Sequence, residues 1–243
     1  MGLNIVVGML ADLDESELDE SELDDAEQDD LAGELCADFA AIGRVLAAAG
    51  LPAWSEPDAA AVEAAEFDMY GYGGLHTLRR LAVHLAESGE LPPPAPVEAA
   101  AEDPLLKDVY SRGPRYGVEV DEGTRLIGSE READGAYDHL VHHSDCEGFY
   151  VPVDFAPVLC TNEITGGWVG SSQRLLEECR RIAARLGLPD DLDPWGDEVS
   201  AAVEADAEGA EGWRRYGVES FTCLQVIAAA RHSIVTGAAI VFC

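Results

Sequence analysis

The chain has 243 residues, 47% of them hydrophobic, and its 48 acidic and 15 basic side chains give a formal net charge of -33. The hydrophobic share suffices for a substantial core, which excludes a disordered protein despite the charge. The charge excludes direct binding to nucleic acid, because each phosphate contact needs a cation and a polyanion would be repelled.

The sequence begins with an apolar run rich in Ile and Val, residues 3–10, which predicts a buried β-strand. This run and the C-terminal run 234–242 are too short for a membrane span, and the first carries no basic leader. We therefore expect a cytoplasmic protein without a membrane partner. Six cysteines with no C-x-x-C pair indicate reduced thiols rather than a disulfide framework.

An acidic run follows at residues 12–30, DLDESELDESELDDAEQDD, with twelve acids and no Lys or Arg. Its ESELD unit occurs at 15–19 and again at 20–24, which is typical of low-complexity expansion. The run predicts a loop or the solvated lead-in to a helix. Its charge suits a basic partner.

Two amphipathic helices are predicted next. Apolar residues recur at intervals of three and four over 30–49 and again over 73–88. Gly50 and Gly89 follow the two patterns, where glycine commonly ends a helix.

The middle of the chain predicts β-structure. It is preceded by a Pro- and Ala-rich stretch at 87–104, which lacks an apolar face and predicts a linker or a long crossing loop. Apolar residues then alternate over 116–120. Residues 137–143 (YDHLVHH) and 149–155 (FYVPVDF), separated by SDCEG, predict strand, turn and strand.

Helices return in the last third. The best-marked one begins at Ser171 or Ser172, either of which can cap it, and runs to Leu186. A weaker acidic helix over 197–208 and another over 219–231 precede the C-terminal strand.

Strands and helices thus occur in blocks, which favours an α+β fold over a doubly wound parallel sheet. We predict a mixed or antiparallel sheet, made of a central β-meander with the N- and C-terminal strands, packed by about four to five helices. The expected organisation is a single domain over 1–243, with a candidate subdomain boundary in 87–104.

One group of residues is typical of a metal or acid–base site: DHLVHHSDCE, residues 138–147. On a helix, His139, His142 and His143 would share a face and, with Asp145, could hold a metal ion for hydrolysis. In the predicted strand, His139 and His143 would lie about 13 Å apart with His142 on the opposite face, too far to share one ion. A polar hairpin with structural histidines is the favoured interpretation.

Charge distribution is more informative than any motif. Between Arg185 and Arg214 there are nine acids and no base, whereas 107–131 holds five of each sign. A negative field of this kind accelerates encounter with a cationic protein. The aromatic side chains that could supply anchor contacts at such an interface are Tyr70, Tyr72, Trp168 and Trp195.

Three segments carry a resemblance: HSDCEGFYVPVDF (143–155), GGWVGSSQRLLEE (166–178) and SFTCLQVIAAARHSIVTGAAIVF (220–242). They resemble uncharacterised bacterial proteins, some of them similar to immunity proteins of polymorphic toxin systems. The resemblance covers under half of the chain. It implies a small acidic cytoplasmic inhibitor that acts through its surface.

The sequence supports three hypotheses of different classes. The first is a non-enzymatic acidic binding protein, of the immunity-inhibitor type, whose partner is a basic protein such as a toxin and which uses no cofactor and no nucleic acid. The second is a metal-dependent hydrolase built on His139, His142, His143 and Asp145. The third is a structural or regulatory module whose acidity serves solubility alone. The oligomeric state stays open.

Overall fold

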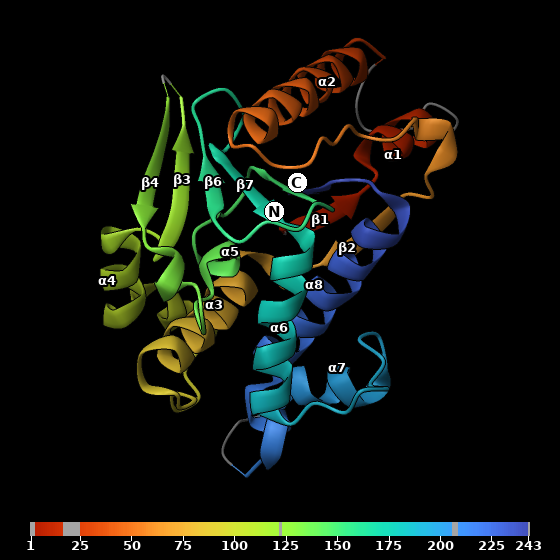
Figure 1. Ribbon diagram of the computed structural model, residues 1–243. Coiled ribbons are helices and arrows are strands. Elements are labelled where there is room, and N and C mark those ends of the chain that lie inside the picture. The colour runs from red at the N-terminus through yellow and green to blue at the C-terminus, as the bar shows by residue number, and fades with distance from the viewer. Residues whose placement is uncertain (1–2, 17–24, 122, 206–208, 243) are drawn as a thin grey trace.

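The computed structural model describes residues 3–16, 25–121, 123–205 and 209–242 (Figure 1). The centre of the acidic run, residues 17–24, lies outside the described residues. The strands are β1 (Asn4–Val7), β2 (Ala65–Asp68), β3 (Tyr116–Val120), β4 (Thr124–Gly128), β5 (Phe149–Val151), β6 (Val158–Cys160), β7 (Trp168–Ser171) and β8 (Ile240–Phe242). The α-helices are α1 (Met9–Ser16), α2 (Asp25–Ala48), α3 (Gly71–Ser88), α4 (Pro104–Arg112), α5 (Asp138–Val141), α6 (Ser172–Leu186), α7 (Asp197–Glu204) and α8 (Gly217–Thr236).

All eight strands join one mixed sheet in the order β2-β1-β8-β5-β7-β6-β3-β4. The pairs β3–β6 and β5–β7 are parallel, and the remaining pairs are antiparallel. The predicted α+β class is therefore confirmed. The described residues form more helices than the four to five expected, because several short helices connect the longer elements.

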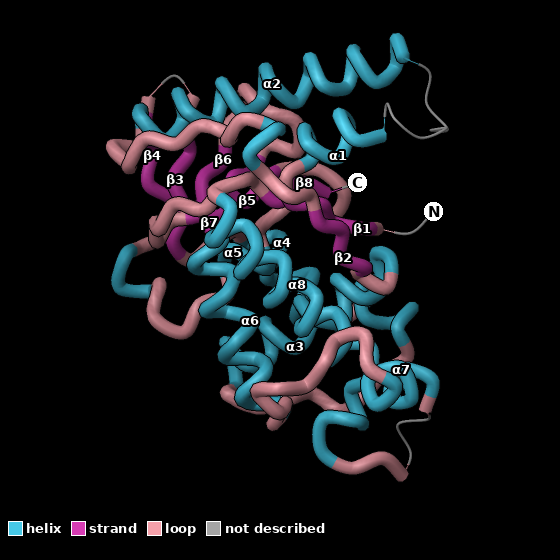
Figure 2. The backbone as a smooth tube through the Cα atoms, turned by 90° about the vertical axis from the view of Figure 1, so that its right-hand side faces the viewer, coloured by secondary structure: helices cyan, strands magenta, loops and turns pink. Residues whose placement is uncertain are grey.

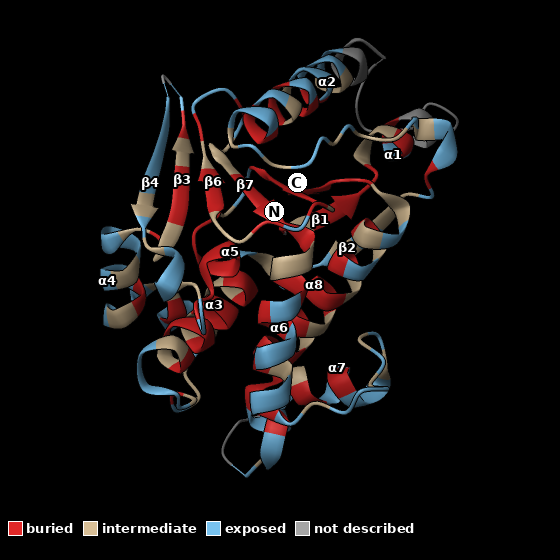
Figure 3. Ribbon diagram, in the orientation of Figure 1, coloured by how far each residue is buried: buried red, intermediate tan, exposed pale blue. Residues whose placement is uncertain are grey.

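Helices cover both faces of the sheet (Figure 2). α2 lies over one face with α1 beside it, and α3, α6 and α8 lie over the other. The sheet therefore separates two hydrophobic cores, and consecutive residues of β5 point into different ones. Phe149 and Val151 pack with residues of α2, among them Phe39 and Ile42. Tyr150, between them, packs in the core that contains residues of α3 and α6. Burial of both faces explains why these strands read as continuous apolar runs (Figure 3).

The ends of the main helices follow their sequence signals. The Ser171 hydroxyl accepts the backbone N–H of Arg174 at the start of α6, and Gly187 ends this helix with φ 74°. Gly89 ends α3 with φ 71°. These caps explain why the predicted boundaries of both helices are close to those observed.

The predicted central meander is wrong in its connections. β3 and β4 form an antiparallel hairpin, as a meander would. However, β3 also pairs with β6 in parallel, and β5 pairs with β7 in parallel. Residues 137–143 do not form a strand, because two buried carboxylates hold them as helix α5. Asp138 accepts the backbone N–H groups of Arg115 and Tyr116, and Glu178 accepts those of His139 and Leu140.

Two further segments differ from the prediction. The C-terminal strand is shorter because α8 extends to Thr236 and ends only at Gly237, with φ 82°. The Pro- and Ala-rich stretch 87–104 contains a 3-10 helix over Val97–Glu102, which contacts α3. Strands from both sides of this stretch pair in the same sheet. Within the described residues, no helix combines the length and the apolar character needed to cross a membrane.

Candidate functional site

The negative charge is concentrated in two segments of the sequence. Residues 1–78 contain nineteen acids and one base, Arg44, and residues 186–213 contain nine acids and no base. Together they supply a net -27 of the total -33. The rest of the chain is therefore close to neutral, and any electrostatic recognition depends on where these two segments lie.

Both acidic segments contact α8: β2 lies beside its C-terminal half, where the ring of Phe67 is 6.3 Å from that of His232, and α7 lies beside its start (Figure 1). β2 is an edge strand of the sheet, and alternation along it exposes Glu66 and Asp68. Asp193 and Asp197 are exposed before and at the start of α7. Among the described residues, the ion pairs include none of these four carboxylates.

Crowding of carboxylates is evident beside β2. The pKa of Asp12, on α1, is raised above its ordinary value, first by partial burial and then by the negative charge of Glu66. Like charges thus lie close together here, and the ion pairs among the described residues include neither of these two carboxylates.

Three aromatic side chains connect the two acidic segments. The ring of Phe221, on α8, lies 6.5 Å from that of Tyr70 and 6.0 Å from that of Trp195, with interplanar angles of 73° and 80°. These are edge-to-face arrangements, which aromatic pairs favour. The outer two rings remain in water, since Tyr70 is 44% and Trp195 59% exposed. We call Tyr70, Phe221 and Trp195 the aromatic row.

The same local motif holds both outer members of the aromatic row. The backbone N–H of Tyr70 donates to Oδ1 of Asp68 at 2.7 Å, and that of Trp195 donates to Oδ1 of Asp193 at 3.0 Å. Each exposed ring therefore follows an aspartate by two residues, in an Asx turn. The motif places one carboxylate near each ring.

Tyr70 occupies a costly backbone conformation. Its φ of 54° and ψ of 36° lie in the left-handed region, where it is the one non-glycine residue among those described. This conformation costs an ordinary residue about 1–2 kcal/mol. The turn is fixed by close packing, since a Cβ on Gly74 would lie 2.1 Å from the carbonyl oxygen of Met69.

The four predicted anchor residues do not lie together. The structure connects Tyr70 and Trp195 through Phe221, and Tyr72 lies in the first turn of α3 with 42% exposure. Trp168 lies elsewhere, on β7, where its ring is 6.4 Å from that of His142. Sequence analysis missed Phe221, because its spacing along α8 matched an ordinary apolar helix face.

The four residues of the metal hypothesis also have separate partners. His139 accepts the N–H of Ser171 at Nδ1 and donates from Nε2 to the carbonyl of Ala156, both at 3.0 Å. The ring of His143 stacks on that of Tyr150 at 4.1 Å.

The other two lie apart from these: His142 faces Asp138 at 3.8 Å, and the Asp145 carboxylate bonds to Arg79 and His76. Burial lowers the pKa of His139 and of His142 to about 4, and that of His143 to about 3. Within the described part of the chain, no three His, Cys, Asp or Glu side chains are placed to hold a metal ion. The metal hypothesis therefore has no geometric support, because packing and backbone bonds already use these imidazoles.

A family model described as "Putative DNA-mimic protein" matches residues 1–242. The chain belongs to this DNA-mimic family. No curated protein and no solved structure matches it. The match agrees with an acidic protein that acts by binding, and it lends no support to the resemblance to immunity proteins.

The family also corrects the predicted partner. The sequence predicted a basic protein partner, such as a toxin, and no role for nucleic acid. The family description instead makes DNA the molecule that is imitated, so that prediction is wrong. The negative charge still argues against direct binding of this protein to nucleic acid. The family description concerns imitation of DNA and not binding to it.

Proposed function

We propose that this protein is a non-enzymatic DNA mimic that binds the DNA-contacting surface of a DNA-binding protein and thereby keeps DNA away from it. The observation that carries this proposal is the net charge of -27 on residues 1–78 and 186–213, in a chain that belongs to a DNA-mimic family. A surface made for cationic contacts to phosphate would be attracted to such a protein.

The charge has the magnitude that mimicry requires. Duplex DNA carries one negative charge per about 1.7 Å of its axis, so a net charge of -33 corresponds to about 56 Å of duplex. A compact chain of 243 residues has a radius of gyration of about 18 Å and is about 45 Å across. The protein therefore presents roughly the charge of a DNA segment of its own size.

Most basic side chains of the described residues form ion pairs with acidic side chains of the same chain. Ion pairs join Arg80 to Asp103 at 2.9 Å, Arg115 to Glu87 at 2.9 Å and Arg174 to Asp154 at 2.8 Å. Such pairs neutralise the regions around α3, α4 and α6. The exposed carboxylates Glu66, Asp68, Asp193 and Asp197 take no part in the ion pairs among the described residues.

The test is competition with DNA for identified proteins. Proteins captured on the immobilised chain at 50 mM salt are purified, and each is bound to a fluorescent duplex of about 20 base pairs whose release is followed by anisotropy. We expect the chain to displace the duplex at equimolar concentration, and its affinity to fall steeply with salt. Polyglutamate of the same total charge is the control and should compete far less well.

Two results would contradict the proposal. Captured proteins that keep the duplex at saturating concentrations of the chain would show that binding does not block DNA. Equal competition by polyglutamate would show that net charge alone displaces DNA and that the folded surface contributes nothing specific.

A further inference from the structure

We infer that the aromatic row is an arginine-binding surface, at which the guanidinium groups of the partner stack on exposed rings between aspartates. This inference deepens the proposed function and rests on it for the identity of the partner. The partner chemistry to which it commits is an arginine-rich, DNA-contacting protein surface.

The first support is exposure that folding does not explain. Two large rings, those of Tyr70 and Trp195, are exposed to water. The core does not need them, because 47% of the residues in the chain are hydrophobic. Tyr70 is held exposed in a left-handed backbone conformation that glycine would adopt without strain. Strain of this kind, maintained by packing around it, is common at binding sites.

The second support is complementarity. Arginine is weakly hydrated and planar, so it can stack on a ring and bond to a carboxylate at once, whereas the compact ammonium of lysine keeps its water. At both outer rings of the row the aspartate two residues earlier, Asp68 or Asp193, supplies that carboxylate. Neither carboxylate takes part in an ion pair among the described residues.

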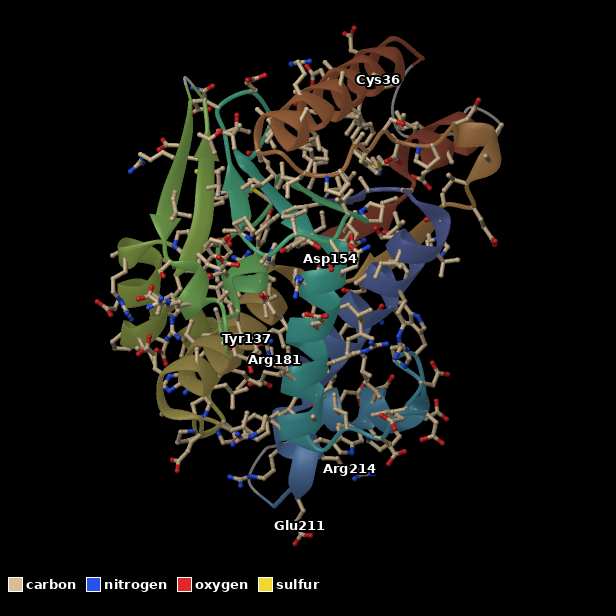
Figure 4. All side chains as sticks on the ribbon, in the orientation of Figure 1. Cys36, Tyr137, Asp154, Arg181, Glu211 and Arg214 are labelled. Carbon is tan, nitrogen blue, oxygen red and sulfur yellow. The ribbon has the colours of Figure 1, made fainter. Side chains whose placement is uncertain are left out.

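The third support is that this chain already uses the same contact within itself. The guanidinium carbon of Arg181 lies 4.6 Å from the ring centroid of Tyr137, and that of Arg214 lies 4.6 Å from the centroid of Trp213 (Figure 4). In both cation–π contacts an exposed arginine covers a buried ring. The cation–π contacts among the described residues include neither Tyr70 nor Trp195, so these two exposed rings are open to an arginine supplied by a partner.

The consequence for mimicry is specific. Arginine is the residue that most often reads guanine in the major groove, besides contacting phosphates. A mimic that stacks arginine would therefore occupy the groups that read bases, and not only those that neutralise the backbone. This predicts a preference for partners rich in arginine over partners equally basic through lysine.

The test compares two probes of equal charge, fluorescein-labelled nona-arginine and nona-lysine, by anisotropy at 50 and 300 mM salt. We expect the protein to bind nona-arginine about fivefold or more tightly than nona-lysine, with the preference surviving at 300 mM salt. Trp195→Ala and Tyr70→Ala should each reduce the preference and leave nona-lysine binding nearly unchanged. Leu126→Ala, at a 58% exposed residue on β4, is the matched control and should change neither.

A second pair of variants tests the carboxylates. Asp68→Asn keeps an oxygen for the N–H of Tyr70 and removes only the charge, so it should weaken nona-arginine binding. Glu130→Gln, exposed on the balanced segment 107–131, should not. Circular dichroism confirms folding of each variant.

The outcomes separate the two proposals. Equal affinity for the two peptides, or a preference that survives Trp195→Ala and Tyr70→Ala, would overturn the arginine-binding surface. A clear arginine preference in a protein that displaces DNA from no partner would overturn the proposed function and leave this inference standing. If Trp195→Ala loses the preference but displaces DNA as well as the wild type, the row lies outside the mimic interface and the inference is wrong.

Discussion

Arg79 and Asp145 form an ion pair whose guanidinium is completely buried and whose carboxylate is 42% exposed. Arg79 also donates to the carbonyl oxygens of Leu140 and His143, each at 2.8 Å. One arginine of α3 thus ties the loop after α5 to the helical layer. Because its other bonds go to backbone carbonyls and to the Tyr110 hydroxyl, the residue has a structural role distinct from the surface cations.

Replacing the two partners should have unequal effects. Arg79→Met leaves two buried carbonyls without donors and should lower the free energy of unfolding by about 3 kcal/mol or more. Asp145→Asn keeps the buried cation bonded to backbone and loses a half-exposed charge, so a cost of about 1 kcal/mol is expected. Urea unfolding measures both. Equal losses would contradict the view that backbone contacts, and not the ion pair, carry most of the stabilisation.

The buried carboxyl of Glu178 makes stability depend on pH. Burial raises its pKa from 4.5 to about 8, against the opposing effect of the N–H donors of Leu140 and His139. The folded state therefore holds a proton that the unfolded state has released, and stability should fall as the pH rises from about 4.5 to about 8.

Glu178→Gln removes that proton equilibrium. The variant should therefore become more stable relative to the wild type as the pH rises. The difference between their free energies of unfolding should change by at most about 1.4 kcal/mol per pH unit within this window. Chemical unfolding at pH 5, 6, 7 and 8 gives the comparison directly. Parallel curves for the two proteins would show that this carboxyl is ionised in the folded state.

Two glycines should respond to alanine with opposite signs. A Cβ on Gly170, in β7, would lie 2.2 Å from the ring of Tyr150, which is itself fixed by a hydrogen bond to the carbonyl of His139. Gly170→Ala should therefore destabilise the protein by about 2–3 kcal/mol. Gly33→Ala, on an exposed turn of α2 with no atom within 4 Å of the new Cβ, should stabilise it by about 0.5–1 kcal/mol. Thermal unfolding of both variants is the measurement, and a gain at Gly170 would refute the packing argument.

The backbone strain at Tyr70 can be measured by comparing two variants that both remove the ring. Tyr70→Gly should be more stable than Tyr70→Ala by about 1 kcal/mol, because glycine adopts a φ of 54° without a Cβ clash. Both should lose the contact with Phe221 equally. Equal stability of the two variants in urea would mean that the turn relaxes when the ring is removed.

Sequence patterns predicted the long helices well and the order of the strands poorly. The ends of α3 and α6 depend on local caps such as Ser171 and Gly187, which a reader of the sequence can recognise. Strand order depends on which distant segments pair, and no local pattern encodes that β5 and β7 run in parallel. The α5 segment differs from the predicted strand for a similar reason, since Glu178 stabilises it from 38 residues away along the chain.

The candidate site was partly predictable. Tyr70 and Trp195 were among the four aromatic residues predicted as anchor contacts, and the Asp-x-aromatic spacing that both share is visible in the sequence. Phe221 could not be recognised, because an aromatic on an amphipathic helix normally enters the core. The histidine cluster was informative only for structure, because its side chains are fixed by partners from β7, α3 and the sheet.

The short strand β8 lies in the middle of the sheet, between β1 and β5. Only its residues, 240–242, join the two-stranded N-terminal part to the five strands on the other side. During synthesis on the ribosome, both halves must consequently keep open edges until residues 240–242 have emerged. A nascent chain that stalls before this strand would expose unpaired β-edges, which makes it a natural substrate for chaperones and proteases.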